Sequence, residues 1–193
     1  MLLPYQIATL LVFLVFAFYV FDIRAKQGMA PLVAGFWTTA MKLIAGATMA
    51  WFVWVVIVKP GVEVADWIAL GLIALGTASV VAAKVTLGRF HTWAGYHKVE
   101  TQLVTHGIYS RIRHPLYTGA ILVEIGVGIV LFSYYRDAAP LVLAMIAAAF
   151  LYMIPFNIIL AGRETEKMRE KFGPVMDDYT SRVRAFFPIR KRA

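Results

Sequence analysis

The chain contains no cysteine, and charged residues make up only 16% of its 193 residues. The lack of cysteine excludes a disulfide framework, a thiolate metal site and a cysteine nucleophile. A soluble domain of this length would carry about 25% charged residues and about 45–50% apolar ones. Here 61% of the residues are hydrophobic and the mean hydropathy is +0.72, so the composition predicts a membrane protein. The length allows one domain, residues 1–193.

Long apolar runs predict where the chain crosses the membrane. A bilayer core of about 30 Å needs about 20 mostly apolar residues in a helix. Pro60-Gly61 marks a turn between the second and third runs, and Tyr134 to Asp137 a tight hairpin between the last two. The first run lacks a basic start and a small-residue cleavage site before Asp22, so we interpret it as a retained span. We expect an all-α integral membrane protein with five spans, at residues 2–21, 38–58, 66–87, 117–135 and 138–162.

The basic residues are distributed unevenly between the two sides that five spans imply. Of the 19 Lys and Arg residues, only Lys59 and Arg136 fall on the side of the second turn and the hairpin. The positive-inside rule then places the N-terminus outside and the C-terminus in the cytoplasm. The net charge of +8 follows from this topology, so it does not predict nucleic acid as a partner.

Two stretches are not needed for spanning: residues 88–116 and residues 163–193. The first is long for a simple connection in so compact a chain. Both lie on the predicted cytoplasmic side, so they can meet. A site built from both would lie at the membrane surface, where water-soluble reagents and lipids can reach it from different sides.

The run LVTHGIYSRIRHPLYTG, residues 103–119, holds the densest cluster of functional side chains. Gly107 permits a left-handed backbone position, and Arg113 offers a fixed cation. Pro115 suits the first turn of a helix and biases His114 away from helix. The N–H groups at this helix start would hold an anion such as an amino acid carboxylate. The alternative is a basic interfacial loop with no ligand.

Glu124 lies inside the fourth span. An ionisable residue at this depth costs about 2.5–3.5 kcal/mol on insertion scales, so a function is the first hypothesis. Glu124 is seven residues after Tyr117, on the same helix face. The alternative is a structural hydrogen bond between helices. In the fifth span, Pro155 and Asn157 suggest a kink, either as a lateral lipid entrance or as ordinary helix shaping.

Glu164 follows the fifth span directly and is the carboxylate of this segment nearest the bilayer. The residues after it, Glu166, Lys167, Glu170 and Lys171, are spaced as i,i+4 neighbours. This spacing is typical of a solvated helix face. We therefore separate Glu164 from that face as a candidate site residue.

The runs GIYSRIRHPLYTG and RETEKMREKFGPVMDDYTSRVRAFFP, separated by the predicted hairpin, resemble the isoprenylcysteine carboxyl methyltransferase family. The resemblance covers about residues 87–188. Phospholipid methyltransferases and membrane sterol reductases share parts of the same pattern. The matching elements are Arg113-His114-Pro115-Leu116-Tyr117-Thr118-Gly119, Glu164, Phe172-Gly173, Tyr179 and Phe187-Pro188.

The resemblance implies a tunnel-like S-adenosylmethionine site that is closed by the C-terminal segment and open to the membrane. The cofactor would contact Leu103, Val104, Gly107, Tyr109, Arg113, His114, Pro115, Tyr117 and Glu164. The family's essential glutamate maps onto Glu164, and Arg163 and Glu124 are further catalytic candidates. Thr165 stands where the family has a second glutamate. Because the family's substrate-binding arginine is replaced, with Arg163 the nearest, the acceptor can be a lipid amine, a thiol or another nucleophile.

The implied partners are a lipophilic or lipid-modified acceptor and membrane lipids, and no feature predicts an oligomeric state. Two alternatives remain: an NADPH-dependent reductase-like member of the superfamily, and a non-catalytic membrane scaffold or carrier. The short chain and the lack of a Gly-rich dinucleotide loop disfavour the reductase. No metal site is expected, because the four histidines do not form a metal-ligand spacing with a carboxylate.

Overall fold

The structure is a computed structural model, and it describes residues 1–20, 29–88, 96–98 and 101–188. All five of its long helices are long and apolar enough to cross a membrane. This confirms the predicted all-α integral membrane fold. The five helices are α1 (Leu2–Val20), α2 (Gly35–Val58), α3 (Val64–Leu87), α4 (Pro115–Tyr135) and α5 (Pro140–Phe172).

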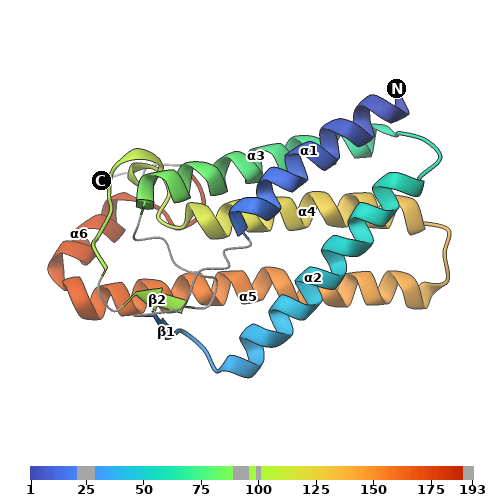
Figure 1. Cartoon of the computed structure of the whole chain (residues 1–193). Coiled ribbons are helices and arrows are strands. Elements are labelled where there is room, and N and C mark those ends of the chain that lie inside the picture. The colour runs from blue at the N-terminus through green and yellow to red at the C-terminus, as the bar shows by residue number, and fades with distance from the viewer. Residues whose placement is uncertain (21–28, 89–95, 99–100, 189–193) are drawn as a thin grey trace.

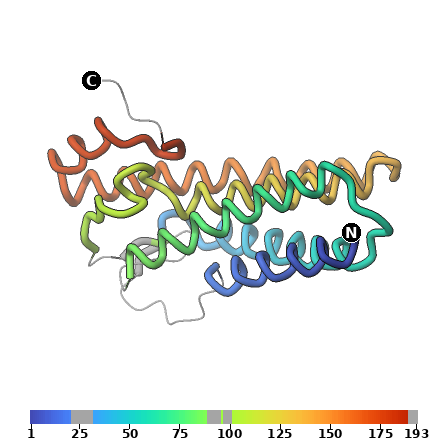
Figure 2. The backbone as a smooth tube through the Cα atoms, turned by 90° about the horizontal axis from the view of Figure 1, so that it is seen from above, coloured from blue at the N-terminus to red at the C-terminus, as the bar shows by residue number. Residues whose placement is uncertain are grey.

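The helices form one bundle in which α3, α4 and α5 run alongside one another (Figure 1). Helix α1 packs mainly on α3, and α2 crosses obliquely to contact α4 and α5. The N-terminus lies at one end of the bundle, with the turns between α2 and α3 and between α4 and α5. The short helix α6 (Pro174–Arg182) lies at the other end (Figures 1 and 2).

The observed helices lie close to the predicted spans, except that the fifth is much longer. Helix α5 continues past residue 162 to Phe172 without a break. The added sequence RETEKMREKF consists almost entirely of strong helix formers, so it extends the helix although it is too polar for the bilayer core. Gly173, with a φ of 51°, then ends α5. A glycine is favoured here because other residues are strained in this left-handed region.

Helices α3 and α4 approach each other very closely through small residues. A Cβ atom added to Gly76 would lie 2.5 Å from the carbonyl oxygen of Gly119, and one added to Gly126 would lie 2.8 Å from that of Ala69. Small residues permit such backbone contact inside a membrane, where dispersion rather than the hydrophobic effect holds helices together. The contact anchors the start of α4, where the Ser79 hydroxyl also donates to the Pro115 carbonyl at 2.8 Å.

The chain after α6 returns to the segment before α4. The backbone N–H groups of Arg113 and His114 donate to the carbonyls of Arg184 and Ala185, at 2.9 and 3.0 Å. The predicted meeting of loop and C-terminal segment is therefore confirmed. We call this end of the bundle, built from residues 101–114 and 173–188 and the adjoining turns of α4 and α5, the loop–tail end. A two-stranded antiparallel ladder, β1 (Met29–Pro31) with β2 (Tyr96–Lys98), is a small addition to the predicted all-α fold.

Candidate functional site

His114 is the residue that joins the loop to α5. It caps α4, whose first position is Pro115, and its Nε2 lies 2.7 Å from the hydroxyl oxygen of Thr165. The Thr165 hydroxyl donates its own proton to the Ala161 carbonyl at 3.0 Å. Its oxygen is therefore left to accept from an Nε2–H group, which assigns the tautomer and leaves Nδ1 of His114 as an acceptor.

The His114 ring is neutral at physiological pH. Its side chain is only 7% exposed. Burial, and then the charge of Arg113, lower its pKa to about 3. Nδ1 of His114 lies 3.9 Å from Oε2 of Glu164. Since the ring is neutral, this contact is not an ion pair. The two atoms are both hydrogen-bond acceptors, and a group with several N–H bonds could donate to both.

Two tyrosines surround the Glu164 carboxylate. The Tyr117 hydroxyl hydrogen-bonds to it from α4, and the Glu164 side chain remains 29% exposed. The pKa of the Tyr109 phenol is raised, mainly because the phenol is buried and also because the Glu164 carboxylate lies nearby. The Tyr109 carbonyl in turn accepts a buried 2.6 Å hydrogen bond from Tyr179 of α6. The tail thus fixes the segment that lines the carboxylate.

Arg113 supplies a cation with a spare donor. Its Nε is buried and has no hydrogen-bond partner among the described residues, and burial lowers the pKa of its guanidinium. The backbone N–H groups of Arg113 and His114 are taken by tail carbonyls. For an anion at this end, the available donors are therefore the Arg113 side chain and the N–H groups of Leu116 and Tyr117 in the first turn of α4.

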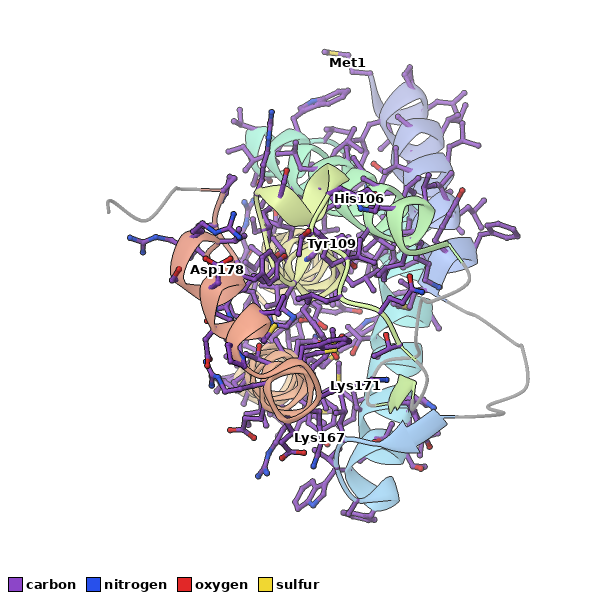
Figure 3. The ribbon with its side chains drawn as sticks, turned by 90° about the vertical axis from the view of Figure 1, so that its left-hand side faces the viewer. Met1, His106, Tyr109, Lys167, Lys171 and Asp178 are labelled. Carbon is purple, nitrogen blue, oxygen red and sulfur yellow. The ribbon has the colours of Figure 1, made fainter. Side chains whose placement is uncertain are left out.

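The loop before α4 folds tightly against α3 and the tail. Gly107 begins a 3₁₀ helix, Gly107–Ser110, with a φ of 58°, and a Cβ atom there would lie 2.9 Å from Oγ1 of Thr86. Leu103 packs on the α6 cluster of Met176, Tyr179 and Val183, and Val104 is half-buried beside it. Figure 3 looks onto this end, where Tyr109 and Asp178 mark the loop and α6.

The structure therefore brings together Arg113, His114, Pro115, Tyr117 and Glu164, but not all the predicted site residues. The Arg163 side chain is 61% exposed and lies 4.0 Å from Glu166, on the outer face of α5. Thr165 was not among the predicted site residues, although it holds the His114 ring. Its place in the motif, where the related family has a second glutamate, was the signal that could have identified it.

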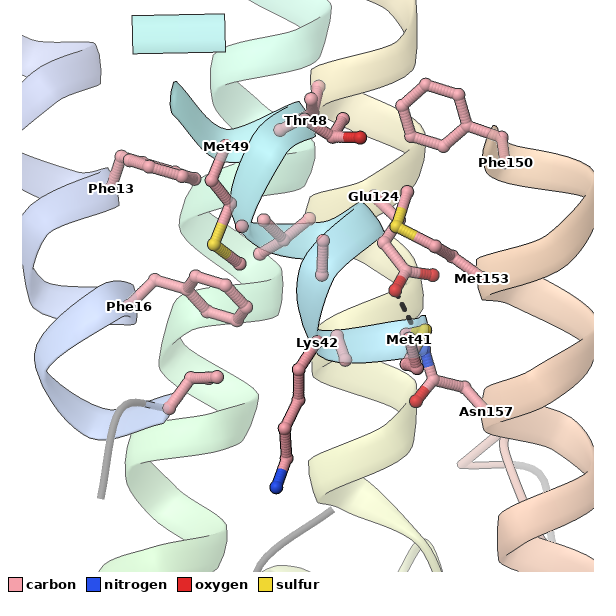
Figure 4. A pocket seen from close by; sticks show the side chains of 16 residues that line it. Phe13, Phe16, Met41, Lys42, Thr48, Met49, Glu124, Phe150, Met153 and Asn157 are labelled. Atoms are coloured by element: carbon pink, nitrogen blue, oxygen red, sulfur yellow. Dashed lines mark hydrogen bonds between the residues drawn. The ribbon is translucent and has the colours of Figure 1, made fainter. Parts of the chain in front are cut away.

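Glu124 lies deeper, on the wall of a separate cavity of about 250 Å³ between α1, α2, α4 and α5 (Figure 4). Its Oε1 accepts a 2.8 Å hydrogen bond from Nδ2 of Asn157. The structural alternative, a bond between helices, is therefore present for one carboxylate oxygen. Elsewhere in the described chain, no three histidine, aspartate or glutamate side chains gather as a metal site would require.

Comparison with known proteins gives a consistent picture. The profile of the family described as phospholipid methyltransferase matches residues 64–174. The nickel-cobalt-cadmium resistance protein NccN of Alcaligenes xylosoxydans xylosoxydans is 34% identical over 125 residues, 63% of this chain and 52% of that protein. The cobalt-zinc-cadmium resistance protein CzcN of Cupriavidus metallidurans is 33% identical over 125 residues, 63% of this chain and 51% of that protein. The chain thus spans about half the length of these curated relatives.

Proposed function

This chain belongs to the phospholipid methyltransferase family, and we propose that it transfers a methyl group from S-adenosylmethionine to a lipophilic acceptor at the loop–tail end. One observation carries the proposal. The neutral His114 and the Glu164 carboxylate present two acceptor atoms 3.9 Å apart, and the same end holds the unpartnered Nε of Arg113.

These groups fit the amino acid part of S-adenosylmethionine. An α-ammonium group carries three N–H donors and can bond to Nδ1 of His114 and Oε2 of Glu164 together. A carboxylate can accept from the Arg113 guanidinium and from the first turn of α4. The two acceptors and the cation thus complement an amino acid zwitterion. The same end also contains Leu103, Val104, Gly107 and Tyr109.

When bound, S-adenosylmethionine supplies a methyl group on a positively charged sulfonium sulfur. A lone pair of the acceptor forms the new bond to this carbon, and the electron pair of the broken C–S bond stays on sulfur, which becomes a neutral thioether. Because this methyl is already activated, the protein's main tasks are in-line positioning and exclusion of water. Tyr117 and Thr165 serve positioning by holding Glu164 and His114. If the acceptor is an ammonium, it must first lose a proton before its lone pair can attack.

We also propose that the loop–tail end faces the cytoplasm. The basic residues predict this orientation through the positive-inside rule. S-adenosylmethionine, which is charged and water-soluble, would then enter from the cytoplasm, whereas the acceptor would enter from the membrane. The reductase-like and non-catalytic alternatives predict different ligand binding, so one titration separates all three.

The test is calorimetric titration of the purified protein in mild detergent with S-adenosylhomocysteine, and in parallel with NADPH. We expect saturable binding of S-adenosylhomocysteine and none of NADPH. Arg113→Gln should abolish the binding, whereas Arg111→Gln, a matched change at an exposed neighbour, should preserve it. Binding of NADPH alone would favour the reductase, and binding of neither by a folded sample would favour the non-catalytic alternative.

A further inference from the structure

The cavity lies farther into the helix bundle than the loop–tail end, and its lining is apolar except for a few groups. Its wall includes Phe13, Phe16, Met49, Phe150 and Met153 (Figure 4). Such a lining favours an apolar ligand, because burying its surface removes it from water.

One polar atom of this wall is unsatisfied. Oε1 of Glu124 is bonded to Asn157, but Oε2 is buried and has no hydrogen-bond partner within the part of the chain that the structure describes. An unpaired buried acceptor is unfavourable, because its lost hydrogen bonds to water are not replaced. Lys42 also lines the cavity, but its side chain extends away from Glu124 in Figure 4, and its ammonium lies 5.5 Å from the centre of the Tyr96 ring.

The cavity and the proposed cofactor site lie along the same seam between α4 and α5. Tyr117 pairs with Glu164, and Glu124 pairs with Asn157. The two pairs are seven residues apart on both antiparallel helices, so they share one seam, about 10 Å apart along it. Met41 lines the cavity and also packs on a cluster nearer the loop–tail end, formed by Tyr117, Phe156, Leu160 and Ala161.

We propose that this cavity binds the apolar body of the methyl acceptor, and that Oε2 of Glu124 accepts a hydrogen bond from a hydroxyl or amine group on that body. The proposal rests on the proposed function, because it places the acceptor next to the cofactor, on the side of the bundle interior. It defines the acceptor class as a lipophile with a hydrogen-bond donor about two helical turns from the methylated atom. An analogue without the donor would leave Oε2 unpaired, which is how buried polar groups produce selectivity.

The experiment compares an alcohol with its methyl ether, in which a methyl group replaces the hydroxyl hydrogen that can be donated. The protein in lipid nanodiscs is photolabelled with a diazirine-bearing decanol, and labelling is competed with n-decanol or with decyl methyl ether. We expect labelling on α1, α2, α4 or α5 at the cavity wall, and about tenfold stronger competition by the alcohol, as one hydrogen bond implies. Equal competition by alcohol and ether in the unaltered protein, or labelling confined to the outer lipid-facing surface, overturns the proposal.

The variant Glu124→Gln should abolish the preference. Nδ2 of Asn157 would still donate to the amide oxygen, so the amide N–H would turn into the cavity, where it can donate to an alcohol oxygen and to an ether oxygen alike. The matched variant Glu170→Gln, which changes an exposed carboxylate of α5, should behave as the unaltered protein. An alcohol preference that persists in Glu124→Gln overturns the role of Glu124.

S-adenosylhomocysteine calorimetry on the same samples separates the two proposals. We expect Glu124→Gln to bind S-adenosylhomocysteine like the unaltered protein, which also verifies its fold. If S-adenosylhomocysteine binds but the alcohol has no advantage, only the acceptor assignment fails. If S-adenosylhomocysteine does not bind to any variant, the cofactor assignment fails whatever the competition shows, and with it the description of the cavity ligand as a methyl acceptor.

Discussion

The two ends of the helix bundle bury polar groups in different ways. At the N-terminal end, Asp66 forms a buried ion pair with Lys59 through Oδ1 and accepts the Glu63 N–H group on Oδ2 at 2.7 Å. At the loop–tail end, His114 and Glu164 present two neighbouring acceptors beside a cation. A buried carboxylate that is held by its own countercharge is a structural contact, whereas two neighbouring acceptors beside a cation are suited to bind a ligand that carries both charges. Variants at each end can test this difference.

The largest effect is expected at the N-terminal end, where the buried ion pair lies. Lys59→Met leaves the fully buried Asp66 without its countercharge, so the free energy of unfolding should fall by about 3–5 kcal/mol. Denaturant unfolding followed by circular dichroism measures this loss. Arg136→Met removes an exposed partner of Glu63 at the same end and should cost about 0–1 kcal/mol. Equal losses in the two variants would contradict a buried, stabilising pair.

The next largest effect concerns activity at the other end. Glu164→Gln keeps the side chain's size but removes its charge, so a bound ammonium would be misplaced and methyl transfer should fall by about 100-fold or more. The free energy of unfolding should change little, since the carboxylate is partly exposed. Transfer of labelled methyl from S-adenosylmethionine to extracted lipids measures the rate, with Glu170→Gln as the control. Activity within a fewfold of the unaltered protein would exclude this role of Glu164.

A pH series sharpens the comparison through His114. Because burial lowers its pKa to about 3 from the usual 6.5, the unfolded chain binds a proton between these values that the folded protein does not. Stability should therefore decrease as the pH falls below about 6.5, by about 1.4 kcal/mol per pH unit from this group alone. Unfolding at pH 7, 6 and 5 measures the slope. His114→Gln should lack this contribution, and an unchanged slope in that variant would refute it.

The smallest effect is expected at Thr165. Thr165→Val removes the hydroxyl that holds Nε2 of His114, and one such hydrogen bond is worth about 0.5–1.5 kcal/mol. The affinity for S-adenosylhomocysteine should fall by up to about tenfold. Thr165→Ser keeps the hydroxyl and should restore the affinity, which a purely steric effect would not do. Failure of serine to rescue would show that the methyl group, rather than the hydroxyl, matters.

The five helices could be predicted because spanning a membrane is a local demand on the sequence. Each span needs its own run of apolar residues, whatever its neighbours are. The same reasoning placed the end of the fifth span at residue 162, and the helix continues beyond it, because hydropathy reports where the bilayer ends rather than where helical hydrogen bonding ends. The end at Phe172 depends instead on helix propensity and on Gly173.

The candidate site could be predicted only to within a segment. Arg163, Glu164 and Thr165 are adjacent, but successive residues of a helix point about 100° apart. The packing of α4 against α5 determines that Glu164 and Thr165 meet His114, while Arg163 points outward. The motif marked the segment, and the helical phase selected its members.

Composition and hydropathy alone determined that this is an integral membrane protein, and the motif identified the segments that contain its candidate site residues. Only the tertiary structure decided which of them meet. The Glu124–Asn157 bond, the seam it shares with Tyr117 and Glu164, and the return of the tail to Arg113 all join residues far apart in the sequence. Such pairings depend on the register of packed helices, which the apolar periodicity of a span does not specify.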